Sequence, residues 1–408
     1  MALEIATHVD LARITAAYED IRRVAHHTPI FTSQTLDAIA GCPVFLKAEN
    51  LQKTGSFKIR GAYYAMSRLT AEERARGVVT ASAGNHAQGI ALGARLNGVK
   101  ATVFMPLGAS IAKVQATKNY GATVRLEGAI FDEAVSAAKA YAAETGALFV
   151  SAFDHDDIIT GQGTVALELL QDLQDVETVI VPVGGGGLIS GMAIALKETN
   201  PRIRVVGVQA AGAPALVRSW QSHELCATPS VRTIADGIAI KHPAERTFHY
   251  IEKYVDEMVV VDDEDTANTI VTLLERLKLV VEGAGAVALT ALLTHKVTGR
   301  GKTAVVLSGG NIDTKLLSSL IERAMLRASR YVRIFTAVED KPGGLAKILK
   351  QIADMQGNLI EVIHNRQSAE VPLGMTGVEI QLETRDQLHI DEILTVLREQ
   401  GYPVQVMP

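Results

Sequence analysis

Residues 178–196, TVIVPVGGGGLISGMAIAL, form a run without a charged side chain. Its length is about that of one helix spanning a bilayer. Pro182 and the four glycines at 184–187 argue against a single helix, because each interior glycine costs a helix roughly 1 kcal/mol. The run is therefore predicted to be a buried strand, a glycine loop and a helix.

The same order of strand, loop and helix recurs along most of the chain. Runs that are apolar or nearly so predict strands covered on both faces: residues 77–82, 100–106, 122–128, 147–153, 179–184, 204–209 and 303–309. Helical stretches at 85–98 and 131–146 each end in a glycine suited to a helix C-cap. The alternation predicts an α/β fold with mostly parallel sheets flanked by helices. Ligands of such sheets bind beyond the carboxyl ends of the strands.

The pattern changes near residue 330. Residues 331–408 are predicted to form strand, helix, strand, strand, helix and strand, which is the ferredoxin-like βαββαβ motif. A separate C-terminal domain over 331–408 leaves 1–325 for the larger one, with a smaller subdomain inserted at about 51–150. A length of 408 residues fits two or three domains.

The composition limits which binding partners and which cellular compartment are expected. The net charge is −5 with a pI near 6.1, and no block of lysine and arginine indicates nucleic-acid or membrane binding, so small-molecule ligands are expected. Cys42 and Cys226 are isolated, which indicates neither a metal cluster nor a disulfide framework and favours the cytoplasm. Residues 1–26 contain early acids and no long apolar core, so they predict an amphipathic helix rather than a signal peptide.

Lys58 lies in KTGSFKIRGA, after a turn and before a helical stretch. A buried ammonium has a lowered pKa, which would make this lysine a nucleophilic amine or a Schiff-base former. The alternative is a surface lysine at the start of a helix.

Two further segments place a helix start directly after a strand. In TASAGNHAQGIAL, residues 80–92, the free amides near Asn85 can bind a carboxylate, although a turn and a cap would explain the same residues. His86 is a candidate base but is more often structural in this position. In VPVGGGGLISG, residues 181–191, glycine amides can bind a phosphate, and the alternative is a glycine-rich turn without a ligand. The segment matches neither a P-loop nor the dinucleotide fingerprint.

The fourth segment, AVVLSGGNID at residues 304–313, ends a strand in Ser308 and two glycines. The Ser308 hydroxyl could hydrogen-bond to a ring nitrogen, but the segment alone predicts only a turn.

Together the segments KTGSFKIRGA, SAGNHAQG, GGGGLISG, EGAGA and SGGN resemble, in order, the fold type II pyridoxal-phosphate enzymes and, within them, the threonine dehydratase (threonine ammonia-lyase) family. The likeness extends over roughly residues 10–325. The segment EDKPGGLAKI at 339–348 resembles the first loop and helix of an ACT domain, a regulatory module that binds amino acids in related proteins.

The resemblance implies roles for individual residues. Lys58 would form the imine with the cofactor and then act as base at the substrate Cα. The implied cofactor contacts are Phe57, Lys58, Asn85, Gly184, Gly185, Gly186, Gly187, Leu188 and Ser308. The substrate carboxylate would lie against Ser82, Ala83, Gly84, Asn85 and His86.

Three positions bear on the reaction type. Ser308 as the partner of the ring nitrogen should leave the ring a weaker electron sink, which favours β-elimination over racemisation. Racemases of this family carry a serine where Ala83 stands, and metal-activated relatives carry a carboxylate where Gln209 stands, so no metal site is expected. Glu282 and Gly283 are candidates for the active-site cleft, although a glutamate before a small-residue helix can simply cap it.

The resulting expectation is dehydration and deamination of L-threonine to 2-oxobutanoate and ammonia, with L-serine to pyruvate as a second reaction. Rival interpretations are a dehydratase of another β-hydroxy amino acid such as 3-hydroxyaspartate, a serine racemase, or a non-catalytic amino-acid sensor. The ACT resemblance implies allosteric control by a branched-chain amino acid, a place in isoleucine biosynthesis and a homo-oligomer, dimer or tetramer. A domain that only assists assembly is the alternative.

Overall fold

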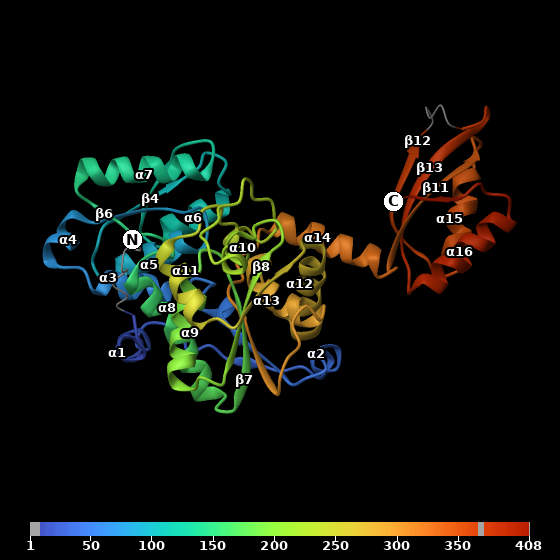
Figure 1. Cartoon of the computed structure of the whole chain (residues 1–408). Helices are drawn as coiled ribbons and strands as arrows, with labels where there is room; N and C mark the ends of the chain where they lie inside the picture. Colours follow the sequence, from blue (N-terminus) through green and yellow to red (C-terminus); the bar gives the residue numbers. More distant parts are fainter. Residues whose placement is uncertain (1–8, 366–370, 408) are drawn as a thin grey trace. The chain divides into compact units, whose positions relative to one another are not determined.

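The computed structural model describes residues 9–365 and 371–407. The chain forms two compact units, Met1–Asp313 and Thr314–Pro408, whose elements are labelled in Figure 1. Helix α14 (Thr314–Arg327) belongs to the second unit, although the predicted catalytic domain extends to residue 325. Each unit is described separately below.

The larger sheet of the first unit has the strand order β1-β2-β10-β7-β8-β9. All neighbours pair in parallel except β1 and β2. The strands are β1 (Ile30–Phe31), β2 (Val44–Ala48), β7 (Val176–Pro182), β8 (Arg204–Ala210), β9 (Glu257–Val261) and β10 (Lys302–Leu307). Strands β7, β8 and β10 are almost entirely buried, as near-continuous apolar runs in a covered parallel sheet should be.

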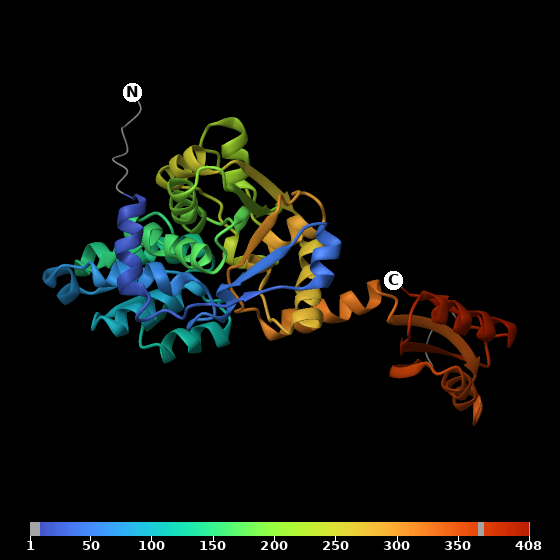
Figure 2. The same cartoon turned by 90° about the horizontal axis from the view of Figure 1, so that it is seen from below.

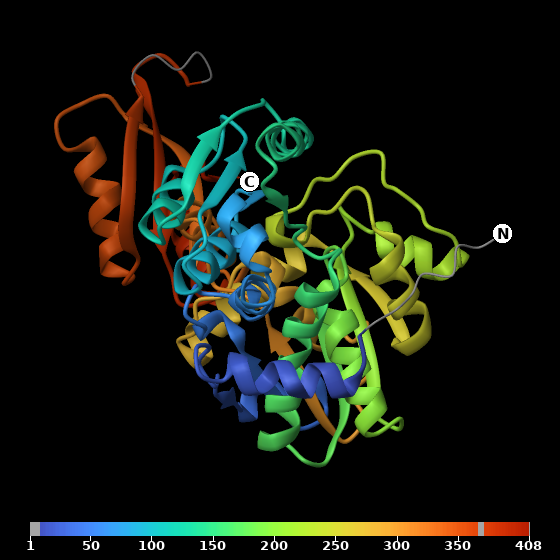
Figure 3. The same ribbon diagram turned by 90° about the vertical axis from the view of Figure 1, so that its left-hand side faces the viewer.

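Helices cover both faces of this sheet (Figure 1). On one face lie α8 (Asp156–Asp172), α9 (Gly187–Thr199) and α11 (Glu245–Tyr254), and on the other α2 (Gln34–Ala40), α12 (Asp263–Leu277) and α13 (Gly283–Leu293). Helix α1 (Leu11–Ile21), the described part of the amphipathic helix predicted in residues 1–26, crosses α8 and α9 (Figure 3). The remaining elements are α10 (Ala215–Ser222) and the 3₁₀ turns η1 (Glu49–Leu51) and η2 (Asp236–Ile238).

The uncharged run 178–196 is divided as predicted. It comprises most of β7, the glycine loop and the first part of α9. None of the helices in the described ranges is both long and apolar enough to cross a membrane.

The smaller sheet of the first unit has the order β5-β4-β3-β6, and every neighbouring pair is parallel. Its strands are β3 (Val78–Ala81), β4 (Ala101–Met105), β5 (Thr123–Leu126) and β6 (Leu148–Phe149). The accompanying helices are α3 (Lys58–Ser67), α4 (Ala71–Arg76), α5 (Asn85–Leu96), α6 (Ile111–Asn119) and α7 (Phe131–Thr145). Helices α5 and α7 cover opposite faces (Figure 1), and Figure 2 shows this blue-to-teal segment beside the larger sheet.

The second unit contains an antiparallel sheet of order β12-β13-β11-β14. Its elements after α14 are β11 (Tyr331–Glu339), α15 (Gly344–Asp354), β12 (Asn358–Asn365), β13 (Met375–Glu383), α16 (Gln387–Glu399) and β14 (Gln405–Val406). The order along the chain is the predicted βαββαβ. Residues 366–370 and 408 of the predicted domain lie outside the described residues.

Helices α3 and α8 touch through two glycines. A Cβ atom added at Gly161 would lie 2.5 Å from the Cα of Gly61 and 2.8 Å from the carbonyl oxygen of Arg60. Both neighbours are backbone atoms, which a side-chain rotation cannot move. This close approach fixes the helix that begins with Lys58 against the helices of the larger sheet.

We expect Gly161→Ala to destabilise the first unit by about 1–3 kcal/mol, because overpacking a rigid contact forces backbone shifts. Urea unfolding followed by the fluorescence of Trp220, the chain's single tryptophan, measures this. Gly108→Ala is the control, since a Cβ there meets nothing within 4 Å. Equal stability of the two variants would contradict the proposed close contact.

Candidate active site

The predicted Lys58 and Ser308 segments lie side by side. Ser56 and Gly309 form an isolated antiparallel bridge. The Phe57 amide donates to the Ser308 carbonyl at 3.2 Å, and the Gly310 amide donates to the Gly55 carbonyl at 2.9 Å. Two segments separated by about 250 residues of sequence therefore meet at the carboxyl end of β10.

Lys58 is the first residue of α3 and keeps partial exposure to solvent. Its Nζ donates to the Ala152 carbonyl at 3.1 Å and lies 5.1 Å from the ring centroid of Phe57. Desolvation lowers the pKa of Lys58 to about 8, against an opposing attraction from Glu282. Near neutral pH an amine with this pKa has a far larger unprotonated fraction than an ordinary lysine with a pKa of 10.5, and the unprotonated form is the nucleophile or base.

Asn85 connects three of the predicted segments. Its Nδ2 donates to Glu282 Oε1 at 2.5 Å, and its Oδ1 accepts from Asn311 Nδ2 at 2.8 Å. The Asn311 amide also donates to the Thr54 carbonyl at 2.7 Å. These bonds fix the orientation of the Asn85 side chain at the start of α5.

Glu282 occupies the N-cap position of α13, but its side chain makes no capping hydrogen bond. Only 3% of the residue is exposed. Burial raises the pKa of Glu282 to about 7, with a further contribution from Asp236. Asp236 itself pairs with Lys113 at 2.6 Å. The carboxyl group thus faces Asn85 and the site rather than the helix amides.

Gly283 and Ser308 are placed by packing. A Cβ at Gly283 would lie 2.7 Å from the Ile234 carbonyl oxygen, so this glycine permits a close backbone contact. Ser308 is buried, and its hydroxyl donates to the Ala284 carbonyl at 3.3 Å.

The glycine loop precedes α9 and offers free amides. The backbone N–H groups of residues 184–187 donate to no acceptor in the part of the chain that the structure describes. Gly186 has φ of +91°, which favours glycine, and a Cβ at Gly185 would overlap the Phe153 ring. Gln209 donates to the carbonyls of Val183 and Gly184 at 3.3 and 3.4 Å. The loop and the helix N-terminus together suit an anion, and Leu188 beside them is buried.

A second set of free amides lies at residues 82–86. The Ser82 hydroxyl accepts from the Gly84 amide at 3.2 Å, whereas the amides of Ala83, Asn85 and His86 donate to no described acceptor. Such a helix start suits a carboxylate.

The His86 side chain is neutral and enclosed. It is 3% exposed, and neither ring nitrogen has a hydrogen-bond partner among the described residues. Desolvation, followed by repulsion from Lys58, lowers the pKa of His86 to about 3. The imidazole therefore carries no charge at neutral pH.

Sequence reasoning missed several contacts. Phe153 and the Ala152 carbonyl follow strand β6. Their position after the end of a strand is the signal that could have identified them. Asn311 lies in the quoted SGGN segment without an assigned role. No sequence pattern indicates that Asp236 and Lys113 contribute to the surroundings of Glu282. No group of three or more histidine, cysteine, aspartate or glutamate side chains suited to a metal ion occurs within residues 9–365 and 371–407.

Comparisons with known proteins agree with this geometry. Residues 21–309 match the family model described as pyridoxal-phosphate dependent enzyme. The chain is 46% identical over 399 residues to an L-threonine ammonia-lyase of Thermotoga maritima, covering 98% of this chain and 100% of that protein.

Two solved structures extend the comparison. Processed threonine deaminase isoform 2 of Solanum lycopersicum has a TM-score of 0.73 at 34% identity, covering 78% of this chain and 87% of that one. Maize serine racemase has a TM-score of 0.74 at 35% identity, and the match covers 78% of this chain and 98% of that one.

The raised pKa of Glu282 predicts a pH effect on stability. Because the folded state holds this proton up to about pH 7 and the unfolded state only to about 4.5, the contribution is present at low pH and is lost as pH rises from 4.5 through 7. We expect Glu282→Gln to remove this loss, worth on the order of 3 kcal/mol or less. Urea unfolding of both proteins at pH 5 and pH 8 measures it. An identical pH dependence in the variant would show that Glu282 ionises normally.

Proposed function

The chain belongs to the pyridoxal-phosphate-dependent enzymes, and on this premise we propose that it is an L-threonine ammonia-lyase that also accepts L-serine. The observation that carries the proposal is the desolvated Lys58 amine, whose pKa is lowered to about 8, in a unit that also presents two sets of free amides at helix starts. The full-length similarity to a threonine ammonia-lyase supports the substrate.

The residues present fit pyridoxal phosphate. Lys58 offers an amine for the aldehyde, and the free amides of residues 184–187 offer donors for the phosphate. Asn85 would contact the ring hydroxyl, and Ser308 would exchange its bond to Ala284 for one to the ring nitrogen. Phe57 and Leu188 complete the proposed contacts. When bound, the cofactor supplies the electron-withdrawing group that weakens the Cα–H bond of an amino acid.

The chain's own groups would position the substrate and move its proton. The amides of Ala83, Asn85 and His86 would bind the carboxylate, with Ser82 and Gly84 shaping the turn. Lys58 Nζ would take the Cα proton, since its pKa near 8 gives it a far larger unprotonated fraction at neutral pH than an ordinary lysine has. Loss of the β-hydroxyl as water, then addition of water and release of ammonia, converts threonine to 2-oxobutanoate.

Alternative reactions differ at specific positions. A racemase is supported by the likeness to maize serine racemase, but Ala83 provides no hydroxyl to deliver a proton from the second face. Gln209 is engaged with backbone carbonyls and the Val217 amide, which leaves no carboxylate for a cation there. Dehydration of 3-hydroxyaspartate would require a further anion-binding group for the extra carboxylate. A non-catalytic sensor would not need a desolvated lysine.

For the C-terminal unit we propose an ACT-like regulatory role over residues 331–408. The observed βαββαβ order and the antiparallel sheet support this role, as does the resemblance of residues 339–348. We propose isoleucine or valine as effector, a homo-oligomer of two or four chains, a cytoplasmic location and a role in isoleucine biosynthesis.

The enzyme proposal is tested at Lys58. Incubation with L-threonine should release 2-oxobutanoate, and Lys58→Ala should lower the rate at least about 10³-fold while the far-ultraviolet circular dichroism stays unchanged. Borohydride reduction and peptide mapping of the holoenzyme should place the pyridoxyl label on Lys58. Chiral analysis of L-serine incubations should detect no D-serine. A label at another residue, or an active Lys58→Ala variant, would overturn the assignment.

The regulatory proposal is tested by deleting residues 314–408, the whole second compact unit. The shortened enzyme should keep kcat within about threefold of the full chain and lose its response to isoleucine or valine, because the effector site and the coupling are removed together. Steady-state rates with and without each amino acid measure this. An unchanged effector response would refute the role of this unit.

A further inference from the structure

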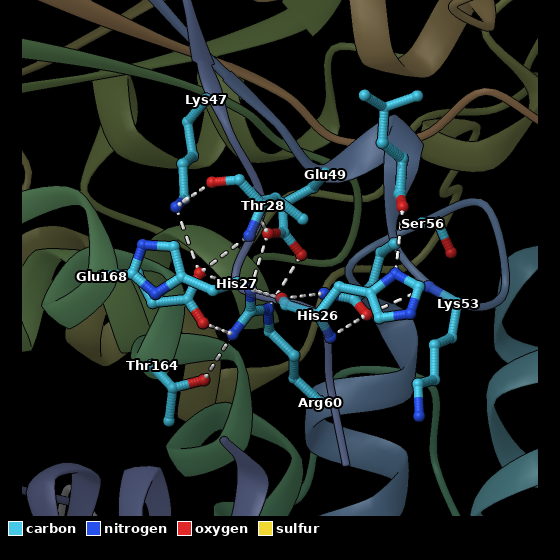
Figure 4. A network of polar contacts seen from close by, with 12 residues as sticks. His26, His27, Thr28, Lys47, Glu49, Lys53, Ser56, Arg60, Thr164 and Glu168 are labelled. Atoms are coloured by element: carbon cyan, nitrogen blue, oxygen red, sulfur yellow. Dashed lines mark hydrogen bonds and ion pairs between the residues drawn. The ribbon is translucent and has the colours of Figure 1, made fainter. Parts of the chain in front are cut away.

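A group of buried charges gathers around Arg60 (Figure 4), which lies in the first turn of the helix that begins with Lys58. Arg60, Glu49 and Lys47 are wholly inaccessible to solvent, and Glu168 is nearly so. They come from four elements: α3, η1, β2 and α8. None of these side chains takes part in the proposed chemistry.

Arg60 uses its whole guanidinium group. Its Nε and Nη2 donate to the two oxygens of Glu49 at 2.8 and 2.7 Å. Its Nη1 and Nη2 donate to the two oxygens of Glu168 at 2.7 and 2.9 Å. Weaker bonds reach the Thr164 hydroxyl at 3.5 Å and the His26 carbonyl at 3.3 Å. Two bidentate pairs hold the guanidinium in one position.

Neighbouring side chains balance the charges and satisfy the hydrogen bonds of this cluster. Lys47 Nζ pairs with Glu168 at 3.1 Å and donates to the Thr28 carbonyl at 2.7 Å. The Thr28 hydroxyl donates to Glu49 at 2.6 Å. Although desolvation opposes ionisation, Glu49 and Glu168 raise the pKa of Arg60, and the hydrogen bonds and charge of Arg60 lower that of Glu168. Arg60 and Glu168 therefore stay charged at neutral pH.

The Glu49–Arg60 pair closes a short loop of chain. The two residues are eleven positions apart, and Lys58 lies between them. Helix α3 has no side-chain cap at its start, so the ordinary means of fixing a first helical turn is missing. Glu168 binds the same guanidinium from α8, 108 positions away, and closes no loop around Lys58.

We propose that the Glu49–Arg60 pair is a positioning device that holds the Lys58 amine in its working place. Buried ion pairs seldom stabilise a fold more than apolar residues of equal size would, so stability alone does not account for the pair. By closing the loop and fixing the first turn of α3, it restricts the movement of Lys58 Nζ. The inference rests on the proposed role of Lys58.

The test compares Glu49→Gln with its matched control, Glu168→Gln. Each removes one charge from a buried carboxylate bound bidentately by Arg60, so both should lower the unfolding temperature. At a temperature where both holoenzymes are folded, Glu49→Gln should lower kcat with threonine at least about tenfold with little change in KM, because small misplacements of a reacting group are costly. It should also speed amide hydrogen exchange in residues 52–59. Glu168→Gln should change both readouts less than threefold.

The outcomes separate the possibilities. Equal effects of the two variants on kcat and on exchange in residues 52–59, or no effect of Glu49→Gln, would overturn the proposal. If Glu49→Gln does not fold, Thr28→Val removes only the hydroxyl that donates to Glu49 and should cause smaller changes in the same direction; no change would again overturn it. Hydrogen exchange needs no substrate, so this result stands apart from the identity of the reaction, which the Lys58 label decides.

Discussion

Desolvation of the Lys58 amine is the constraint on which the rest of the site depends. The amine keeps one carbonyl acceptor, that of Ala152, and its pKa falls to about 8. The same burial raises the pKa of Glu282 to about 7. Burial therefore shifts the pKa values of an amine and a carboxyl group toward neutral pH. The charge of each group also favours the charged form of the other. Groups poised in this way exchange protons at a small free-energy cost.

A second buried cation of the same helix, Arg60, is stabilised in the opposite way. Arg60 lies two residues from Lys58 but is held by two carboxylates, so its charge is permanent. Lysine and arginine suit these roles, because an ammonium changes its pKa readily on burial and a guanidinium does not. Two positions in the first turn of α3 thus carry one amine with a lowered pKa and one permanent charge.

The sequence predicted the parts of the fold and site that depend on local order. The seven predicted strand runs each contain or overlap an observed strand, because parallel strands covered on both faces are nearly continuously apolar. The prediction that all seven are covered on both faces was wrong for β5, which lies at the edge of its sheet and is mostly exposed. Strand β2 was not anticipated, since its buried Lys47 breaks that pattern. No local sequence pattern identifies Glu49 and Glu168, because their ion pairs with Arg60 form only when α3 and α8 pack together. The sequence left Glu282 as a candidate for the active-site cleft with a helix cap as the alternative, and in the structure its side chain caps no helix amide but accepts from Asn85.

Close helix contacts connect the fold to the chemistry. A Cβ at Gly89 would lie 3.1 Å from the Lys58 carbonyl carbon, so α5 rests directly on the backbone of the reactive residue. Gly61 and Gly161 bring α8 equally close to α3. The backbones of α5 and α8 therefore lie against the first turn of α3 and enclose it on two sides. The glycines that let the three helices meet thus contribute to the desolvation that lowers the pKa of Lys58.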